Sequence, residues 1–246
     1  MLILKCFVVI KIAICYVVLE VNIAMINVEK EPLTKRINKE KIMHYKYIPQ
    51  FLYKEEADFL YAKLLTSIPW RQVKYFKPER GLVTTPRLTW VCGFHQQEFY
   101  SMSFPQKVMP NQIPDFLIPL KDLVEETLNT SFNYILFSFY RDENDSITYH
   151  SDDEKFLGSD PTIASITLGQ QRVFSLKNKH NKQKEDFCLT HGDLFIMQNN
   201  CQKDFLHSVP KQKEKLNPRI SLTFRNVLNE SGSYNYYKYN YLNTII

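Results

Sequence analysis

Short segments rich in β-branched and aromatic residues follow one another through the second half of the chain, with turn residues between them. This pattern is typical of strands in a compact β-structure. Shorter apolar runs from Trp70 onward, broken by proline and glycine, predict additional strands and hairpins. In the second half we expect strands at residues 134–140, 147–150, 163–168, 172–176, 193–198 and 219–226.

Helical periodicity is confined to the front of the chain. Apolar residues recur at helical spacing within residues 53–68, and acidic residues occupy the first turn there. A second helix is expected within residues 114–128, where Pro119 fits the first turn. Helices at the front and many short strands behind them predict an α+β fold with a jelly-roll or barrel core.

Length and composition limit the classes of protein that the chain can represent. Its 246 residues suit one large domain, or one domain with an added N-terminal segment. A content of 44% hydrophobic and 23% charged residues excludes a mostly disordered chain and a multi-span membrane protein. Lysine and arginine outnumber aspartate and glutamate by 31 to 26, which permits a polyanionic partner without requiring one.

The two ends of the chain differ from its middle. Residues 1–42 combine an apolar stretch with a polar run, and fit a signal-like segment, a membrane anchor or a non-essential extension. We expect the folded domain at residues 43–230 and a polar, tyrosine-rich tail at residues 231–246. Membrane contact is expected only if residues 1–25 are a real anchor. The five cysteines form no CxxC pair, which favours reduced thiols in an intracellular protein of the nucleus or cytoplasm, and we expect a monomer.

His150 and Asp152 form an H-x-D triplet at the end of a predicted strand. In an extended chain, residues i and i+2 project from the same face, so the imidazole and the carboxylate could bind one ion together. His207 could supply a third ligand. Two imidazoles and one carboxylate on one side of a metal leave the other positions open, as a non-haem Fe(II) oxygenase requires. The triplet alone also fits an ordinary polar loop.

One face of the last predicted strand carries Arg219, Ser221, Thr223 and Arg225, and apolar residues occupy the other face. Two guanidinium groups inside a barrel are costly unless anions neutralise them, and the arginine fork matches a carboxylate. An enclosed dicarboxylate would meet that need. The alternative is an arginine pair on the outer face of an edge strand. Residues 134–140 alternate in the same way, so the Tyr140 hydroxyl could contact the same anion.

These residues belong to an ordered set of motifs that extends along most of the chain. The set consists of PRLTW (86–90), FNYILFSFYRDENDSITYHSDDE (132–154), PTIASITLG (161–169), HGDLFIM (191–197), His207 and PRISLTFR (218–225). It resembles the AlkB family of Fe(II)/2-oxoglutarate dioxygenases, and in particular the animal-type DNA and RNA dealkylases. The resemblance covers residues 48–228. It implies a double-stranded β-helix, or jelly-roll, core with the N-terminal helices packed on one side.

The resemblance also implies a role for each residue of the site. Fe(II) would be bound at the catalytic centre by His150, Asp152 and His207, with 2-oxoglutarate as co-substrate and dioxygen as oxidant. Arg219 and Tyr140 would hold the distal carboxylate of 2-oxoglutarate, and Arg225 would help to close the pocket. The same pocket would include Ser138, Ser221 and Thr223. Both serines stand where the family usually has asparagine, which leaves the affinity for the co-substrate open.

Substrate contacts are expected on the open side of the metal. Asp153 matches the family position that contacts an extruded base, and Glu154 follows it. Tyr100 matches an aromatic residue that stacks on the base, although it also fits an ordinary half-buried strand tyrosine. Lysines within residues 177–184 and 211–215, in segments expected to be loops, could follow the phosphates of a nucleic-acid partner or could simply be solvated.

The function that the resemblance implies is oxidative demethylation of N-alkylated bases, such as 1-methyladenine and 3-methylcytosine, in DNA or RNA. Formaldehyde would be released, and the process would be direct-reversal repair of alkylation damage. One alternative is an RNA N6-methyladenine demethylase, which uses the same chemistry with a different base pocket. Another is a catalytically weak nucleic-acid-binding module of the same fold, suggested by Ser138 and Ser221. The intact metal-binding and arginine positions argue against this last interpretation.

Overall fold

The computed structural model describes residues 43–77, 81–93, 99–101, 104–108 and 111–228. Contacts within the chain divide it into two units, residues 1–41 and 42–246, and the described residues all belong to the second unit. The possible anchor at residues 1–25 and the tail at 231–246 lie outside the described residues. Among the described residues, no helix has the length and apolar character needed to cross a bilayer.

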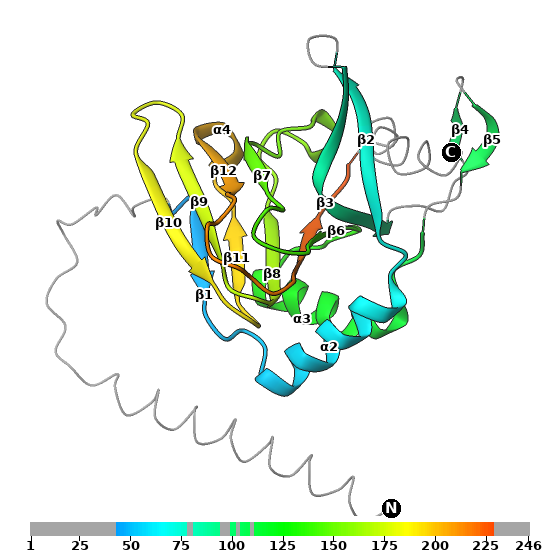
Figure 1. Ribbon diagram of the computed structural model, residues 1–246, viewed down its shortest axis with the longest axis horizontal. Coiled ribbons are helices and arrows are strands. Elements are labelled where there is room, and N and C mark those ends of the chain that lie inside the picture. Colours follow the sequence, from blue (N-terminus) through cyan, green and yellow to red (C-terminus); the bar gives the residue numbers. More distant parts are fainter. Residues whose placement is uncertain (1–42, 78–80, 94–98, 102–103, 109–110, 229–246) are drawn as a thin grey trace, which may run out of the picture. The chain divides into compact units, whose positions relative to one another are not determined.

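Two antiparallel sheets form most of the structure (Figure 1). The larger sheet has seven strands in the order β1-β11-β8-β13-β6-β3-β2. Its strands are β1 (Tyr45–Ile48), β2 (Arg71–Lys77), β3 (Gly81–Gly93), β6 (Tyr134–Tyr140), β8 (Ile163–Gly169), β11 (Leu194–Met197) and β13 (Arg219–Arg225). The smaller sheet has the order β10-β9-β12-β7, with β7 (Ile147–His150), β9 (Arg172–Asn178), β10 (Lys184–Leu189) and β12 (Phe205–Val209). A short hairpin consists of β4 (Phe99–Ser101) and β5 (Phe104–Val108).

Helices α2 (Lys54–Ser67) and α3 (Ile118–Leu128) lie together on one side of the strands (Figure 1). The Glu56 side chain accepts a hydrogen bond from the backbone N–H of Tyr53 and so caps the start of α2. α3 has proline at its start and ends at Asn129, whose left-handed backbone stops the helix. The shorter helical segments are η1 (Asp115–Leu117), η2 (Lys155–Leu157) and α4 (Cys201–Asp204). The two expected helices are confirmed.

The larger sheet separates an apolar core from a polar interior. Leu60 and Leu64 of α2 and Val124 of α3 pack in one core with Ile220 and Leu222 of β13. Burial of each such side chain contributes about 1.5–3 kcal/mol of stability. The opposite face of β13 carries the two predicted arginines, and both are buried. The alternation in the sequence therefore directs apolar residues toward the helices and polar residues into the space next to the smaller sheet.

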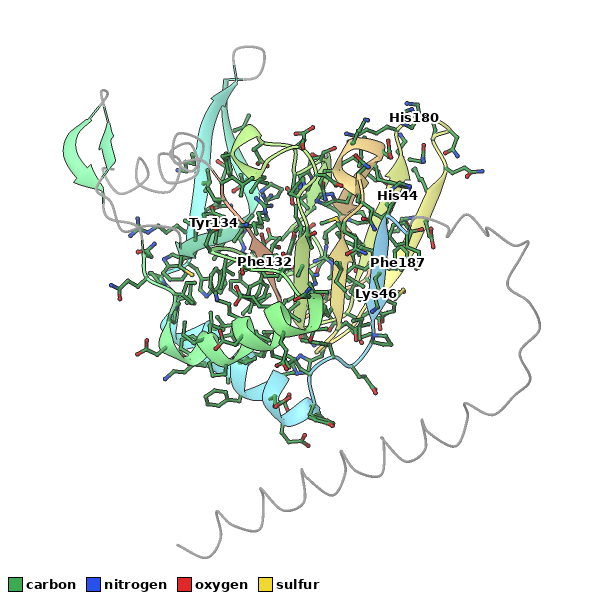
Figure 2. All side chains as sticks on the ribbon, turned by 180° about the vertical axis from the view of Figure 1, so that it is seen from behind. His44, Lys46, Phe132, Tyr134, His180 and Phe187 are labelled. Atoms are coloured by element: carbon green, nitrogen blue, oxygen red, sulfur yellow. The ribbon has the colours of Figure 1, made fainter. Side chains whose placement is uncertain are left out.

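Aromatic side chains join the edge strands β1 and β10 of the two sheets. The ring centroid of Tyr45 lies 5.5 Å from that of Phe187 and 5.9 Å from that of Phe195. The Tyr45 hydroxyl donates to Glu185, and burial together with this contact raises the pKa of Tyr45 to about 12. Phe187 is labelled in Figure 2, where side chains fill the space between the strands. This closure gives the expected α+β jelly-roll fold with helices on one side.

Five elements were not expected from the sequence: β1, η2, β10, α4 and β12. β1 and β10 are edge strands, and three of the six residues of β10 are charged, so hydrophobic alternation is weak there. α4 and β12 are short and follow each other directly, which leaves little periodicity to detect. Lys177 and Lys184 were expected in loops, but they are directly opposed partners in β9 and β10. Their loop assignment was wrong because pairing between strands, rather than local pattern, determines this hairpin.

Candidate active site

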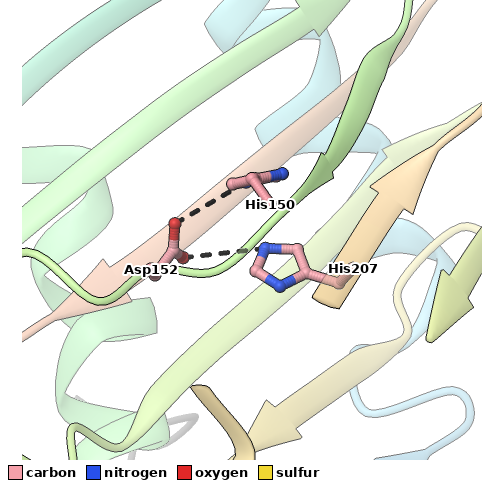
Figure 3. Close-up of side chains that lie close together, drawn as sticks. All are labelled: His150, Asp152 and His207. Atoms are coloured by element: carbon pink, nitrogen blue, oxygen red, sulfur yellow. Dashed lines mark ion pairs between the residues drawn. The ribbon is translucent and has the colours of Figure 1, made fainter. Parts of the chain in front are cut away.

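Strand pairing brings the three predicted metal ligands together. His150 ends β7, His207 lies in β12, and the two residues are direct cross-strand partners. Asp152 follows two residues after His150. The Nε2 atoms of His150 and His207 lie 3.7 and 3.8 Å from the two carboxylate oxygens of Asp152 (Figure 3). One ligand atom from each of the three residues lies within 4.8 Å of the others, a spacing at which one ion can contact all three.

Neighbouring groups orient the ligands. The Nδ1 atom of His150 donates to the carbonyl of Thr148 at 2.9 Å, so Nε2 of His150 is left to bind a metal. The backbone N–H of Asp152 donates to Oε1 of Gln202 at 2.9 Å, which fixes the turn after β7. The ring of Phe174 stacks on that of His207, with 5.6 Å between centroids. The three ligand residues are therefore held in position by hydrogen bonds and ring stacking from their neighbours, as is usual around a metal site.

The electrostatics of the site favour the protonation states that metal binding requires. Burial lowers the pKa of His207 to about 3, so this imidazole is neutral at neutral pH. Asp152 is 2% exposed, and Nη2 of Arg225 lies 2.7 Å from its Oδ2 atom. Burial opposes ionisation of Asp152, but Arg225 and the two imidazoles outweigh it and lower the pKa of this carboxyl. Neutral histidines with one carboxylate are the donor set of non-haem Fe(II) enzymes.

A single pocket contains every residue predicted to bind the metal or the co-substrate. Besides the metal ligands, its lining includes Ser138, Tyr140, Arg219, Ser221, Thr223 and Arg225. The predicted inward orientation of the arginines is therefore confirmed, and the alternative of an outer edge strand is wrong, because β13 lies between β8 and β6 inside the larger sheet.

Arg219 is well suited to bind an anion in this pocket. Its side chain is 1% exposed, and Nη2 donates to Oγ1 of Thr167 at 2.9 Å. Among the described residues, Nε and Nη1 of Arg219 have no hydrogen-bond partner. Burial lowers the pKa of Arg219 to about 10, which still leaves it charged at neutral pH. A buried cation with free donors suits a carboxylate, and the distal carboxylate of 2-oxoglutarate fits this requirement.

The two serines that depart from the family pattern are cross-strand neighbours. Ser138 of β6 pairs directly with Ser221 of β13. The hydroxyl of Ser221 lies 2.9 Å from that of Ser165 in β8, so Ser221 is part of a hydrogen-bonded pair on the pocket wall. Both serines are buried. They supply hydroxyl groups beside the arginines at positions where asparagine would supply an amide.

Two residues that support the site had no role predicted from the sequence. Arg172 of β9 is 1% exposed, and its guanidinium lies 5.5 Å from the ring centroid of Tyr140. An arginine that begins a predicted strand of mostly apolar residues is the signal that could have identified it. Gln202 is held by α4 behind Asp152. No local pattern marks Gln202, because its role depends on the approach of two segments far apart in sequence.

The predicted substrate contacts are only partly described. Asp153 is exposed and lines an open cleft together with Lys179 and Lys203. Glu154 is half-buried and adjoins it in the chain. Tyr100 belongs to strand β4, but its side chain lies outside what the structure describes. The lining of the pocket that holds the metal ligands includes neither Asp153 nor Glu154, so their contacts with a base stay predictions, as does stacking by Tyr100.

Comparisons with known proteins agree with this geometry. The family model described as 2OG-Fe(II) oxygenase superfamily matches residues 44–225. The chain is 35% identical to alpha-ketoglutarate-dependent dioxygenase alkB homolog 3 of Mus musculus over 188 residues, covering 73% of this chain and 64% of that protein. Identity to the Homo sapiens protein of the same name is 34%, with the same coverage. DNA oxidative demethylase ALKBH2 of Arabidopsis thaliana is 32% identical, over 45% of this chain and 44% of that protein.

Solved structures support the same fold. OsALKBH1 superposes with a TM-score of 0.50 at 16% sequence identity, over 74% of this chain and 98% of that chain. A 2OG-Fe(II) family oxidoreductase from Burkholderia pseudomallei gives a TM-score of 0.51 at 14% identity, over 76% and 86% of the two chains. The chain spans 64% of the length of the alkB homolog 3 proteins that it matches. With the family match covering most of its length, the chain belongs to the 2OG-Fe(II) oxygenase superfamily.

Proposed function

We propose that this chain is a nucleic-acid demethylase that uses Fe(II), 2-oxoglutarate and dioxygen to remove N-methyl groups from damaged bases. The observation that carries the proposal is one pocket that combines the three metal ligands with Arg219, a buried cation with unpaired donors. A metal site alone fits many reactions. A metal site beside a buried arginine that can bind a carboxylate fits a reaction that consumes a keto acid.

The residues of the chain prepare the site for the co-substrate. His150, Asp152 and His207 would hold Fe(II) on one side and leave the facing positions open. Arg219 and Tyr140 would receive the distal carboxylate and so orient 2-oxoglutarate toward the metal. Arg225 keeps Asp152 ionised and adds positive charge to the wall. When bound, Fe(II) would use dioxygen to convert 2-oxoglutarate to succinate and CO2, and this chemistry would place one oxygen atom on the methyl carbon. The hydroxymethyl group then leaves the base as formaldehyde.

The substrate class follows from the open side of the metal and from the relatives. The relatives named DNA oxidative demethylase and alkB homolog make a nucleic acid the favoured partner. A methyl group on the Watson–Crick edge of a base is reachable only after the base leaves any duplex. Asp153 and Glu154 would contact the polar edge of the extruded base, and Tyr100 would stack on its face. We expect the enzyme to act inside the cell, as a monomer, on 1-methyladenine and 3-methylcytosine.

A panel of modified oligomers tests this proposal. The full chain is incubated with Fe(II), 2-oxoglutarate and single- or double-stranded DNA and RNA that carry one 1-methyladenine, 3-methylcytosine or N6-methyladenine. Products are identified by mass spectrometry, with Asp152→Asn as the matched control. Demethylation of the first two bases supports repair of alkylation damage. Reaction with N6-methyladenine alone would replace it with the regulatory role, and binding without any reaction would support the weak binding module.

A further inference from the structure

Arg172 is a buried cation that the proposed reaction does not yet use. Its guanidinium donates at 2.8–2.9 Å to three carbonyl oxygens, those of Asp142, Asp145 and Pro210. The nearby carboxylate of Asp145 is held at 2.7 and 2.9 Å by Arg141. Burial lowers the pKa of Arg172. Enclosing a cation that is bound mainly by backbone oxygens is costly, which calls for a reason beyond filling space.

The contact of Arg172 with Tyr140 supplies such a reason. The guanidinium carbon of Arg172 lies 5.5 Å from the centroid of the Tyr140 ring, and that of Arg219 lies 5.3 Å from the same centroid. Both distances are within the range of cation–π attraction. The planar guanidinium of Arg172 is fixed by its three carbonyl contacts, so it offers a rigid surface to the ring. Tyr140 lines the pocket that contains Arg219, and it is almost fully buried.

We propose that Arg172 is a positioning residue for 2-oxoglutarate, which acts by holding the Tyr140 ring so that its hydroxyl faces the carboxylate bound by Arg219. This inference rests on the proposed co-substrate pocket. Arg172 makes no contact with the co-substrate in this scheme. Its effect on affinity passes through Tyr140, and this route distinguishes it from a residue that merely stabilises the fold.

Direct binding of 2-oxoglutarate separates these roles without any nucleic acid. Isothermal titration calorimetry measures the Kd for 2-oxoglutarate with the full chain loaded with Mn(II) in place of Fe(II). We expect Arg172→Met to raise Kd about tenfold, which corresponds to about 1.4 kcal/mol. Arg172→Lys should also raise Kd, because an ammonium group keeps the charge but cannot lie flat on the ring and reach three carbonyls. If the methionine variant does not fold, the lysine variant serves in every comparison.

Tyr140→Phe tests whether the effect passes through the tyrosine hydroxyl. This change keeps the ring and removes the group that would contact 2-oxoglutarate. Once the hydroxyl is absent, its placement no longer matters, so the Arg172 substitution should change Kd by less than about twofold in the Tyr140→Phe background. An equally large change in both backgrounds would overturn the proposal, because Arg172 would then act by another route.

Arg141→Met is the matched control for loosening of the adjoining loop. Arg141 binds the side-chain carboxylate of Asp145, whose backbone carbonyl accepts from Arg172, but the Arg141 side chain is 43% exposed. We expect its Kd to stay within about twofold of the unmodified chain. An equal rise in Arg141→Met and Arg172→Met would assign the effect to the loop and overturn the positioning role. Normal Kd in both Arg172 variants would do the same. Failure of the unmodified chain to bind 2-oxoglutarate would instead overturn the proposed pocket itself.

Discussion

The ion pair between Arg225 and Asp152 allows the electrostatics of the site to be tested without any reaction. Both side chains are 3% exposed, and their closest atoms are 2.7 Å apart. Removing one member of such a buried pair leaves an uncompensated charge, at a cost of about 3–5 kcal/mol. The histidine nitrogens, at 3.7 and 3.8 Å from Asp152, are too distant to replace the arginine. We therefore expect Arg225→Met to lower the free energy of unfolding by about 4 kcal/mol.

Urea unfolding of the metal-free chain at pH 7 measures this loss. Asp152→Asn removes the buried charge, so the double variant Arg225→Met with Asp152→Asn should be more stable than Arg225→Met alone. Mn(II) should also restore part of the loss in Arg225→Met, since a bound cation neutralises the same carboxylate. A cost below about 1 kcal/mol, the scale of a surface ion pair, would contradict a buried and uncompensated charge on Asp152, as would a double variant no more stable than the single one.

Three other predictions concern the co-substrate, pH and the base. Arg219→Lys keeps the charge but loses the bidentate fork, so the KM for 2-oxoglutarate should rise markedly in steady-state turnover, and a normal KM would contradict the pocket. The double variant Ser138→Asn with Ser221→Asn should lower that KM or leave it unchanged. Burial lowers the pKa of His207 from 6.5 to about 3. As pH falls, the unfolded chain therefore binds a proton at His207 before the folded chain does, and the free energy of unfolding of the metal-free chain should decrease by about 2 kcal/mol between pH 6.5 and 5. Urea unfolding across this range should show a smaller decrease in His207→Asn, and an identical slope would refute the assignment. Tyr100→Ala should weaken productive binding of the methylated oligomer by about 1–3 kcal/mol while uncoupled consumption of 2-oxoglutarate stays constant, and Tyr100→Phe should leave both nearly unchanged. Equal losses of coupled and uncoupled turnover in Tyr100→Ala would place Tyr100 in the structural core.

The strand alternation was the part of the fold that the sequence predicted best. In β13 the period of two decides which residues enter the helix-side core and which enter the pocket, so the inward orientation of Arg219 and Arg225 could be foreseen. The central strands are long and apolar enough for this pattern to be clear. β10 gave no such signal, because an edge strand with charged residues is held by pairing and not by its own periodicity.

The candidate site shows the same division. The H-x-D spacing identifies His150 and Asp152 locally, but the pairing of His207 with His150 depends on β12, a strand that the sequence did not predict. Gln202 has no local signature, and the arginine in a predicted strand marks Arg172 without revealing its contact with Tyr140, since each acts on a residue that is distant in sequence. Chemistry that depends on one segment could therefore be predicted, and contacts between segments required the structure.

The stoichiometry of two products tests whether this chain is a nucleic-acid demethylase. The full chain, given Fe(II), dioxygen, 2-oxoglutarate and an oligomer with a single 1-methyladenine, should release formaldehyde and succinate in equal amounts. Asp152→Ala should release neither, because one of three protein ligands to the metal is lost. Succinate without formaldehyde from the unmodified chain would show an oxygenase with a different substrate. Equal amounts of both products from Asp152→Ala would contradict the assignment of Asp152 as a metal ligand.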